Sequence, residues 1–302
     1  MNPTFSVGIS FKNPGPHFRM ALQSVFAQTC NDWELILMDD GSTDDSLPLA
    51  KSLTDPRVRV FSDGTSRNLN VRLNEMVRLS RGKYFVRMDA DDVMHPERLE
   101  RQFEVLRCSG SNTVVGSAAY SIDSNSNIIG LRRGAARQQT GFDARYSFIH
   151  PTVAASVDWF RRNPYSQSAV YSRAEDAELW CRTSHSSEFV TITEPLLYYR
   201  EAGLGSFPSY INSKTGLLHL LCERYSRPIP IYATRLAVEL AKIWIAFLLR
   251  GAGRDERIGG WRYEQLPSGT IERAIAGLAH VQRQTLPVAL GCDIDVSEEL
   301  PA

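Results

Sequence analysis

The chain has 302 residues, enough for one large domain or two moderate ones around a sizeable core. Lysine plus arginine and aspartate plus glutamate each number 34, so the formal net charge is zero and bulk electrostatics gives no reason to expect a nucleic-acid partner. The five cysteines are odd in number and form no C-x-x-C pair, which argues against a disulfide scaffold or a zinc site and predicts a reducing compartment.

Strands and helices are predicted to alternate through the first hundred residues. Buried strands are indicated at residues 5–11, 33–38, 57–61 and 83–88, while one amphipathic helix ends near Gln28 and another covers 68–81. No basic region followed by an apolar stretch precedes the first strand, so we expect no cleaved signal peptide. The alternation is typical of β-α-β units around a mostly parallel sheet, in which ligands bind outside the carboxyl ends of the strands.

A cluster of three carboxylates directly follows the strand at 83–88. At a period of two, Asp89 and Asp91 project to the same side as the strand runs out, and Asp92 begins the loop. Clustered acids repel, so a fold that keeps them close is expected to place something cationic between them. Oxygen ligands from a short loop suit Mg²⁺ or Mn²⁺. The alternative is an acidic turn that caps a helix beginning near Pro96, because aspartate is common at helix starts.

Polar residues also follow the other strands of the predicted sheet. Asn13 comes after the first strand, and Asp39 and Asp40 come after the second. Plain turn chemistry would also explain the turn at 39–44, which supplies an N-cap for the next helix. The agreement between sheet topology and the position of the polar groups nevertheless favours a ligand site at these strand ends.

Several longer motifs resemble the inverting family-2 glycosyltransferases of the GT-A fold. The matching runs are residues 21–29 (ALQSVFAQT), 32–37 (DWELIL), 39–44 (DDGSTD), 81–84 (RGKY), 89–92 (DADD) and 96–99 (PERL). The resemblance is close from residue 4 to about 107 and looser to about 200. It implies an α/β, Rossmann-like and mostly parallel sheet flanked by helices. It also implies a nucleotide-sugar donor, usually a UDP-sugar, that lies across the strand ends.

The resemblance assigns roles to the acidic residues. Asp39 matches the position whose carboxylate accepts a hydrogen bond from the base. Asp91 and Asp92 match positions that hold the ribose and a divalent metal, Mn²⁺ or Mg²⁺, and Asp89 completes the D-x-D motif. Arg67, just before the helix at 68–81, is a candidate nucleotide contact.

The base pocket departs from the family pattern at one position. Where many relatives carry an aromatic residue at the end of the first strand, this chain has Lys12. Base stacking would then fall to Phe11 or be absent, which leaves the identity of the base open. Ser10 is still expected to line the pocket.

The segment 174–182 (AEDAELWCR) resembles the family's Glu-Asp element before a Leu-Trp helix. The resemblance places Asp176 at the general-base position, with Glu175 as the alternative base and Trp180 on the acceptor side. An acceptor hydroxyl is a weak nucleophile, so its attack requires a carboxylate within hydrogen-bond reach to take the proton. The competing interpretation of Asp176 is a first-turn acid favoured by the helix macrodipole.

His150, in the run His-Pro-Thr, resembles an element near the acceptor side of many relatives. The imidazole could line the active site. A lone histidine is as readily a satisfied structural residue, so both interpretations stay open.

The chain is expected to divide near residue 205. A catalytic domain would cover 1–205, with a nucleotide-binding half at 1–110 and an acceptor half at 111–205, and 206–302 would form a helical C-terminal region. The helix at 231–250 is apolar but contains Arg235, Glu239 and Lys242, so a bilayer span is not expected. It could lie at the membrane interface and bring the enzyme to a lipid-linked acceptor, or it could serve as a core or homodimer helix.

These patterns predict a metal-dependent inverting glycosyltransferase of the hexosyltransferase class, acting on a saccharide hydroxyl. The resemblance implies bacterial O-antigen or capsule assembly at the cytoplasmic side of the membrane. Two alternatives remain. A sugar-phosphate nucleotidyltransferase would want a Gly-rich, Lys/Arg-bearing phosphate loop where this chain has residues 13–17 (NPGPH). A non-catalytic sugar-nucleotide or glycan-binding module would have lost the chemistry altogether.

Overall fold

The computed structural model describes residues 2–134, 148–201 except 172, and 264–289 except 268, together with scattered positions between 216 and 252. The strands are β1 (Phe5–Phe11), β2 (Trp33–Asp39), β3 (Val58–Phe61), β4 (Tyr84–Asp89), β5 (Val93–Met94), β6 (Thr113–Ile122), β7 (Ile128–Arg132), β8 (Ala154–Ser156) and β9 (Glu188–Arg200). The helices are α1 (His17–Phe26), α2 (Ser46–Ser52), α3 (Leu69–Leu79), α4 (Arg98–Leu106), α5 (Val157–Arg162), α6 (Glu175–Thr183) and α10 (Thr270–Gln282), with 3₁₀ turns at η1 (His150–Thr152) and η2 (Ala169–Tyr171).

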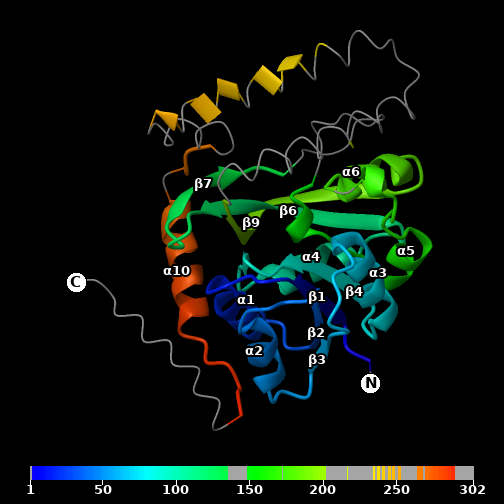
Figure 1. Cartoon of the computed structure of the whole chain (residues 1–302), viewed down its shortest axis with the longest axis vertical. Coiled ribbons are helices and arrows are strands. Elements are labelled where there is room, and N and C mark those ends of the chain that lie inside the picture. Colours follow the sequence, from blue (N-terminus) through cyan, green and yellow to red (C-terminus); the bar gives the residue numbers. More distant parts are fainter. Residues whose placement is uncertain are drawn as a thin grey trace.

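The described strands form one sheet in the order β3-β2-β1-β4-β8-β6-β9-β5, with β7 paired to β6 (Figure 1). The four strands of the first half are parallel, whereas β8 runs antiparallel to both β4 and β6. The predicted strands and helices of the first hundred residues are confirmed to within two residues at each end. The predicted α/β class with a sheet flanked by helices is therefore confirmed. The sheet was predicted to be mostly parallel; as a whole it is mixed, and β1 to β4 form a parallel part of it.

Strand register places the acidic turns side by side. β1 lies between β2 and β4, and its last residues pair with the ends of both: Phe11 with Asp39, and Ser10 with Asp89. Because parallel strands end at the same edge of a sheet, the two acidic turns that are about fifty residues apart in sequence become neighbours across one strand.

Two apolar clusters cover the two faces of the sheet. Alternate residues of β4 divide between them: Tyr84, Val86 and Met88 belong to the cluster that packs α1 and α4, whereas Phe85 belongs to the cluster that packs α3, α5 and α6. The period of two therefore sends Arg87 and Asp89 to the same face as Phe85, which is the face of α6. α6 begins with Glu175 and Asp176.

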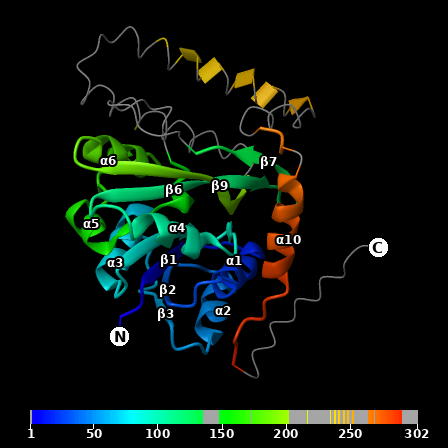
Figure 2. The same ribbon diagram turned by 180° about the vertical axis from the view of Figure 1, so that it is seen from behind.

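The described part of the chain beyond residue 205 returns to this sheet. α10 lies beside α1 in both views (Figures 1 and 2), and Tyr198 of β9 donates a hydrogen bond to the Ala274 carbonyl at 2.8 Å. Gly277 allows this approach, because a Cβ there would lie 2.9 Å from Nε2 of His95. Further on, the Ala289 N–H donates to the Ser52 carbonyl at 2.9 Å. The domain boundary at 205 remains a prediction, but residues 264–289 pack on the catalytic sheet.

Most of the helix predicted at 231–250 lies outside the described residues. The positions that are described include four exposed large apolar side chains: Val238, Trp244, Ile245 and Leu248. Within the described parts of the chain, no helix combines the length and hydropathy that crossing a bilayer would require.

Candidate active site

The turn after β2 is an acidic turn whose carboxylates are all hydrogen-bonded. Oδ1 of Asp39 accepts from the Ser42 N–H at 2.8 Å, and Oδ2 accepts from the Ser62 hydroxyl at 2.7 Å. Burial acts to raise the pKa of Asp39, but these hydrogen bonds outweigh it and hold the pKa below its ordinary value. The carboxylate is thus ionised and held in place by the protein alone.

Asp40 is organised by an arginine that the sequence analysis missed. Arg72 of α3 is 2% exposed, and each of its nitrogens has a partner. Its Nε donates to Asp40 at 2.8 Å, and its two terminal nitrogens reach Glu75 and Asp63. A signal was present in the sequence: Arg72 lies three residues after Leu69 and one before Leu73, on the apolar face of the predicted helix.

The candidate base-pocket residues have different surroundings. Ser10 is half-buried at the end of β1, and Arg67 is half-exposed, with its backbone N–H donating to Asp40 at 2.7 Å. The expected stacking role of Phe11 is wrong in this structure. Its ring is 2% exposed and packs on Phe18 with centroids 4.7 Å apart, so neither face is open to a base. Strand alternation is the reason, since Phe11 falls on the core-facing side of β1.

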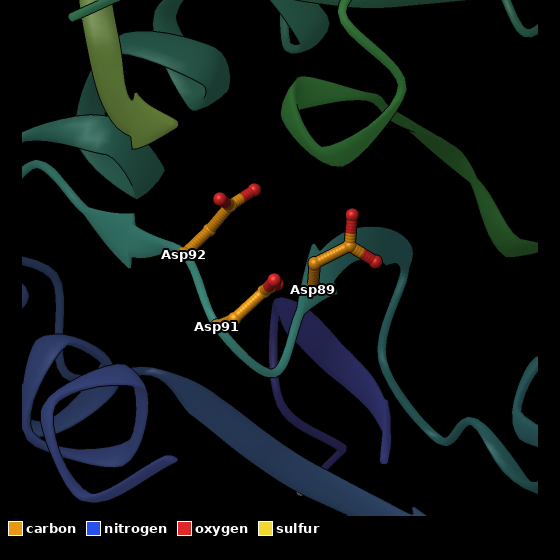
Figure 3. A group of neighbouring side chains, drawn as sticks. All are labelled: Asp89, Asp91 and Asp92. Carbon is orange, nitrogen blue, oxygen red and sulfur yellow. The ribbon is translucent and has the colours of Figure 1, made fainter. Parts of the chain in front are cut away.

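The acidic cluster after β4 gathers as predicted. One ligand oxygen from each of Asp89, Asp91 and Asp92 can be chosen so that all lie within 4.8 Å of one another. Figure 3 shows the three side chains leaving one short stretch of chain with their carboxylates toward the same side. Asp89 pairs with Arg87 at 2.5 Å, but the other two acids have no such side-chain ion pair among the described residues.

Burial and the neighbouring negative charges disfavour the ionised forms of Asp91 and Asp92. Burial and the charge of Asp89 raise the pKa of Asp91, and burial with the charges of both neighbours raises the pKa of Asp92 well above its ordinary value. Asp92 is 1% exposed, its Oδ1 accepts only the Arg200 N–H at 2.8 Å, and its Oδ2 has no hydrogen-bond partner in the described structure.

Arg200 at the end of β9 fixes this loop from the other side. Its Nε donates to the Asp91 carbonyl at 2.9 Å, and its terminal nitrogens donate to the Asp123 carbonyl at 2.7 Å and the Ser126 hydroxyl at 3.0 Å. The acidic loop is therefore tied to the β6–β7 turn through the Asp91 carbonyl, while the Arg200 N–H occupies only one oxygen of Asp92. Sequence reasoning assigned the strand ending at Arg200 but not this role.

The cluster fits a divalent cation. An unpartnered carboxylate oxygen at Asp92 and an oxygen-only ligand set are what Mg²⁺ or Mn²⁺ prefers.

The first turn of α6 contributes a second pair of carboxylates. Asp176 Oδ1 accepts from the Ala177 N–H at 2.8 Å. Burial raises the pKa of Asp176, and burial together with Asp176 raises the pKa of Glu175 to about 7. The charge of Asp89 acts on Asp176 across the site. The start of α6, which carries the predicted base, therefore lies within electrostatic reach of the predicted metal cluster.

His150 and Trp180 are surrounded as residues that support the fold usually are. Nε2 of His150 lies 2.9 Å from the Tyr165 hydroxyl, and burial with the nearby Arg87 charge holds the pKa of His150 well below its ordinary value. Trp180, expected on the acceptor side, is 3% exposed and stacks on Trp159 with centroids 6.3 Å apart. Its ring therefore belongs to the core, because the face of α6 that carries it packs against the sheet.

Two proteins named as glycosyltransferases are similar to this chain in sequence. A putative glycosyltransferase, EpsE of Bacillus subtilis, is 30% identical over 185 residues, spanning 60% of this chain and 66% of that protein. An uncharacterized glycosyltransferase of Methanocaldococcus jannaschii is 24% identical over 213 residues, spanning 68% of this chain and 73% of that protein. The chain thus matches only about two thirds of the length of the first of these relatives.

Solved structures share the fold. S. aureus TarS 1-349 in complex with UDP-GlcNAc superposes with a TM-score of 0.56 at 13% identity, covering 73% of this chain and 66% of that chain. A second TarS 1-349 structure superposes with a TM-score of 0.57 at 14% identity, covering 92% and 80%. The family model described as Glycosyl transferase family 2 matches residues 6–168, more than half of the chain. This protein therefore belongs to glycosyl transferase family 2.

Proposed function

We propose that the protein is a metal-dependent inverting glycosyltransferase that moves a sugar from a nucleotide-sugar, of the UDP-sugar class, to a saccharide hydroxyl. The observation that carries the proposal is the Asp89–Asp91–Asp92 cluster at the carboxyl ends of the strands, with an unpartnered oxygen on Asp92, within electrostatic reach of the Glu175–Asp176 turn. One group is suited to a diphosphate with its cation, and the other to a hydroxyl proton.

The donor would lie across the ends of β1, β2 and β4. Asp39 would accept a hydrogen bond from the base, Ser10 would line the pocket, and Arg67 would contact the nucleotide from the rim. UDP is the expected nucleotide because structures of the similarly folded S. aureus TarS are described as complexes with UDP-GlcNAc and with UDP. Phe11 is left out of this assignment because its ring is buried.

Asp91 and Asp92 would hold the cation, and Asp89 would complete the donor side. The unpartnered Oδ2 of Asp92 supports this assignment, because a buried carboxylate oxygen without a donor is costly unless something positive faces it. When bound, the cation offsets the negative charge that develops on the leaving diphosphate.

Asp176 would act as the general base. In its ionised form, the carboxylate accepts the proton of the acceptor hydroxyl as the oxygen attacks the anomeric carbon. Attack from the face opposite the leaving diphosphate inverts the configuration. Because burial raises the pKa of Asp176, the active form of the enzyme appears only as the pH rises above that pKa. Glu175, whose pKa is about 7, is the neighbour with which Asp176 shares this titration.

The acceptor would be a lipid-linked glycan in surface-polysaccharide assembly, such as O-antigen or capsule. A chondroitin synthase of Escherichia coli is 32% identical over 129 residues, spanning 42% of this chain and 19% of that protein, and its name connects a relative to polysaccharide synthesis. The exposed Trp244 and Leu248 support a peripheral contact of the 231–250 helix with the cytoplasmic face of the membrane. The same apolar side chains would also suit a homodimer contact.

Thermal stabilisation by nucleotides and nucleotide-sugars, with and without Mn²⁺, tests the proposal directly. A ligand that binds only the native state raises the Tm by mass action. We expect a Mn²⁺-dependent shift with UDP and with one UDP-sugar, followed by transfer from that sugar to a saccharide acceptor. A shift with another nucleotide would discard the base assignment. Absence of any shift would favour a non-catalytic module, and release of pyrophosphate from a sugar phosphate and a nucleoside triphosphate would favour a nucleotidyltransferase.

A further inference from the structure

Arg87 is a buried arginine in the middle of the candidate site. It lies in β4, two residues before Asp89, and 3% of its surface is exposed. One terminal nitrogen pairs with Oδ1 of Asp89 at 2.5 Å. Its backbone is fully engaged, because its N–H donates to the Val153 carbonyl at 2.9 Å and its carbonyl accepts from Arg98 at 2.8 Å. The side chain is therefore held on the α6 face of the sheet.

Arg72 serves as a comparison for Arg87, because its contacts are those of an arginine that only organises its surroundings. It is equally buried, yet all three of its nitrogens have partners. Arg87, in contrast, leaves Nε and Nη1 without a hydrogen-bond partner among the described residues. Buried donors are rarely left unpaired unless the group has another use. A hydrophobic side chain would fill the same space at lower cost.

The charge of Arg87 reaches both halves of the site. On the donor side it pairs with Asp89 and its charge acts on Asp91 and Asp92, and on the acceptor side its charge acts on Tyr165 and the α6 carboxylates. Burial acts to lower the pKa of Arg87, but these acids outweigh it, so the guanidinium stays charged. Burial raises the pKa values of Glu175 and Asp176, and the charge of Arg87 partly offsets this increase.

We propose that Arg87 is a positioning residue for the transfer reaction: its buried guanidinium holds Asp89 from the sheet face that α6 covers, and its charge couples the donor-side acids to the Glu175–Asp176 turn. The inference rests on the proposed function. Arg87 touches neither substrate nor cation in this assignment and acts through Asp89 and Asp176.

The groups that face Asp176 set the sign of the expected effect. They are Arg87 and Asp89 from β4, Tyr165 from the segment before η2, and Glu175 from α6 itself. Of these, only Arg87 is a cation. Removing its charge therefore raises the pKa of the α6 carboxylates, and the acidic limb of the pH–kcat/KM profile moves to higher pH.

The test compares Arg87→Met, Arg87→Gln and Arg87→Lys with Arg72→Met as a matched buried-arginine control. For the two neutral variants at Arg87 we expect kcat at neutral pH to fall by about 10²-fold with a much smaller change in donor KM, because general-base catalysis is worth about that much. Arg87→Lys should recover the position of the acidic limb. Arg72→Met should leave that limb in place, whatever it does to stability or donor KM.

A neutral Arg87 variant with the wild-type pH profile would overturn the proposal. So would failure of both neutral variants to fold, since the buried charge of Arg87 would then be required for folding. An activity-independent readout separates this proposal from the proposed function. Carboxyl ¹³C NMR titration, assigned with Asp176→Asn and Glu175→Gln, should show the α6 carboxylates titrating at higher pH in Arg87→Met. An enzyme that transfers no sugar would disprove the function, and the NMR titration would still decide the role of Arg87.

Discussion

The two acidic turns of the site contain similar residues but differ in how the protein satisfies them. In the turn after β2, both oxygens of Asp39 accept hydrogen bonds, and Asp40 is held by Arg72 and the Arg67 N–H. In the turn after β4, Asp92 keeps an oxygen without a partner in the described structure, and burial and mutual repulsion raise the pKa values of Asp91 and Asp92.

The difference indicates that the hydrogen bonds of the first turn are complete without a ligand, whereas those of the second turn are not. A satisfied carboxylate network is preorganised and rigid, whereas a partly satisfied buried one is costly and needs a counter-charge. The first turn is thus suited to present fixed acceptors to a neutral base. The second is suited to capture a cation together with an anionic diphosphate.

Asp91→Ala should have the largest effect, because it removes a carboxylate from the incomplete turn. We expect turnover to fall by about 10²–10³-fold, the range seen when one charge-stabilising group is removed from an active site, and the Mn²⁺-dependent Tm shift with UDP to disappear. Steady-state kinetics and thermal shift measure the two effects. Unchanged turnover in this variant would remove the metal assignment.

Asp176→Asn should come next and should separate binding from chemistry. General-base catalysis contributes about 10²-fold or more, and Glu175 remains beside the site, so kcat should fall by about 10²-fold while donor binding remains close to wild type. Glu175→Gln serves as the matched control on the same turn and should cost less. Wild-type rates in Asp176→Asn, with a deep loss in Glu175→Gln, would move the base to Glu175.

Arg72→Met should damage stability rather than chemistry. It leaves the buried Asp40 without its charged partner, and breaking a buried pair in this way costs roughly 3 kcal/mol. Urea unfolding measures the loss as a lower midpoint at unchanged slope. Arg67→Met is the exposed control, and its half-exposed ion pairs should contribute less than about 1 kcal/mol. Equal losses in the two variants would contradict the view that the first turn is a rigid, self-satisfied unit.

The smallest effects should be opposite in sign at the two turns. The pKa of Asp92 is raised by folding, so the unfolding free energy of the cation-free protein falls as pH rises above the ordinary value. Asp92→Asn mimics the neutral acid and should raise the Tm in EDTA at pH 7 by a few degrees. The pKa of Asp39 is lowered, so its stabilisation is present at pH 7 and lost at low pH, and Asp39→Asn should lower the Tm. Tm shifts of the same sign in Asp92→Asn and Asp39→Asn would contradict the difference between the two turns.

Local sequence patterns were sufficient to predict the first secondary-structure elements and the positions of the acidic turns. Strand and helix periodicity predicted the elements of the first hundred residues, and the strand-end rule predicted that the turns of Asp39 and Asp91 would meet. Phe11 and Trp180 are buried in the core rather than open to a ligand. The sequence could not show this, because an aromatic residue at a strand end or on a helix has the same pattern whether it faces a ligand or the core.

The arginines that organise the site could not be assigned in this way. Arg72 reaches Asp40, and Arg200 reaches the Asp91 and Asp123 carbonyls, from distant parts of the sequence. Arg87 pairs with the nearby Asp89, but its charge also acts on the distant α6 carboxylates. A charged residue within an apolar pattern signals that a partner exists, as at Arg72 and Arg87, but not which one.

The sequence by itself determined the α/β class, the acidic turns at the strand ends and the Glu-Asp start of α6. Each of these features depends on the periodicity, turn residues or motif of a short stretch of sequence. Only the tertiary structure decided which carboxylates are satisfied and which are left unpaired, that Arg87 lies between the donor-side and acceptor-side acids, and that α10 returns to the catalytic sheet. Burial and ionisation depend on atoms brought together from distant parts of the chain, so no local pattern contains them.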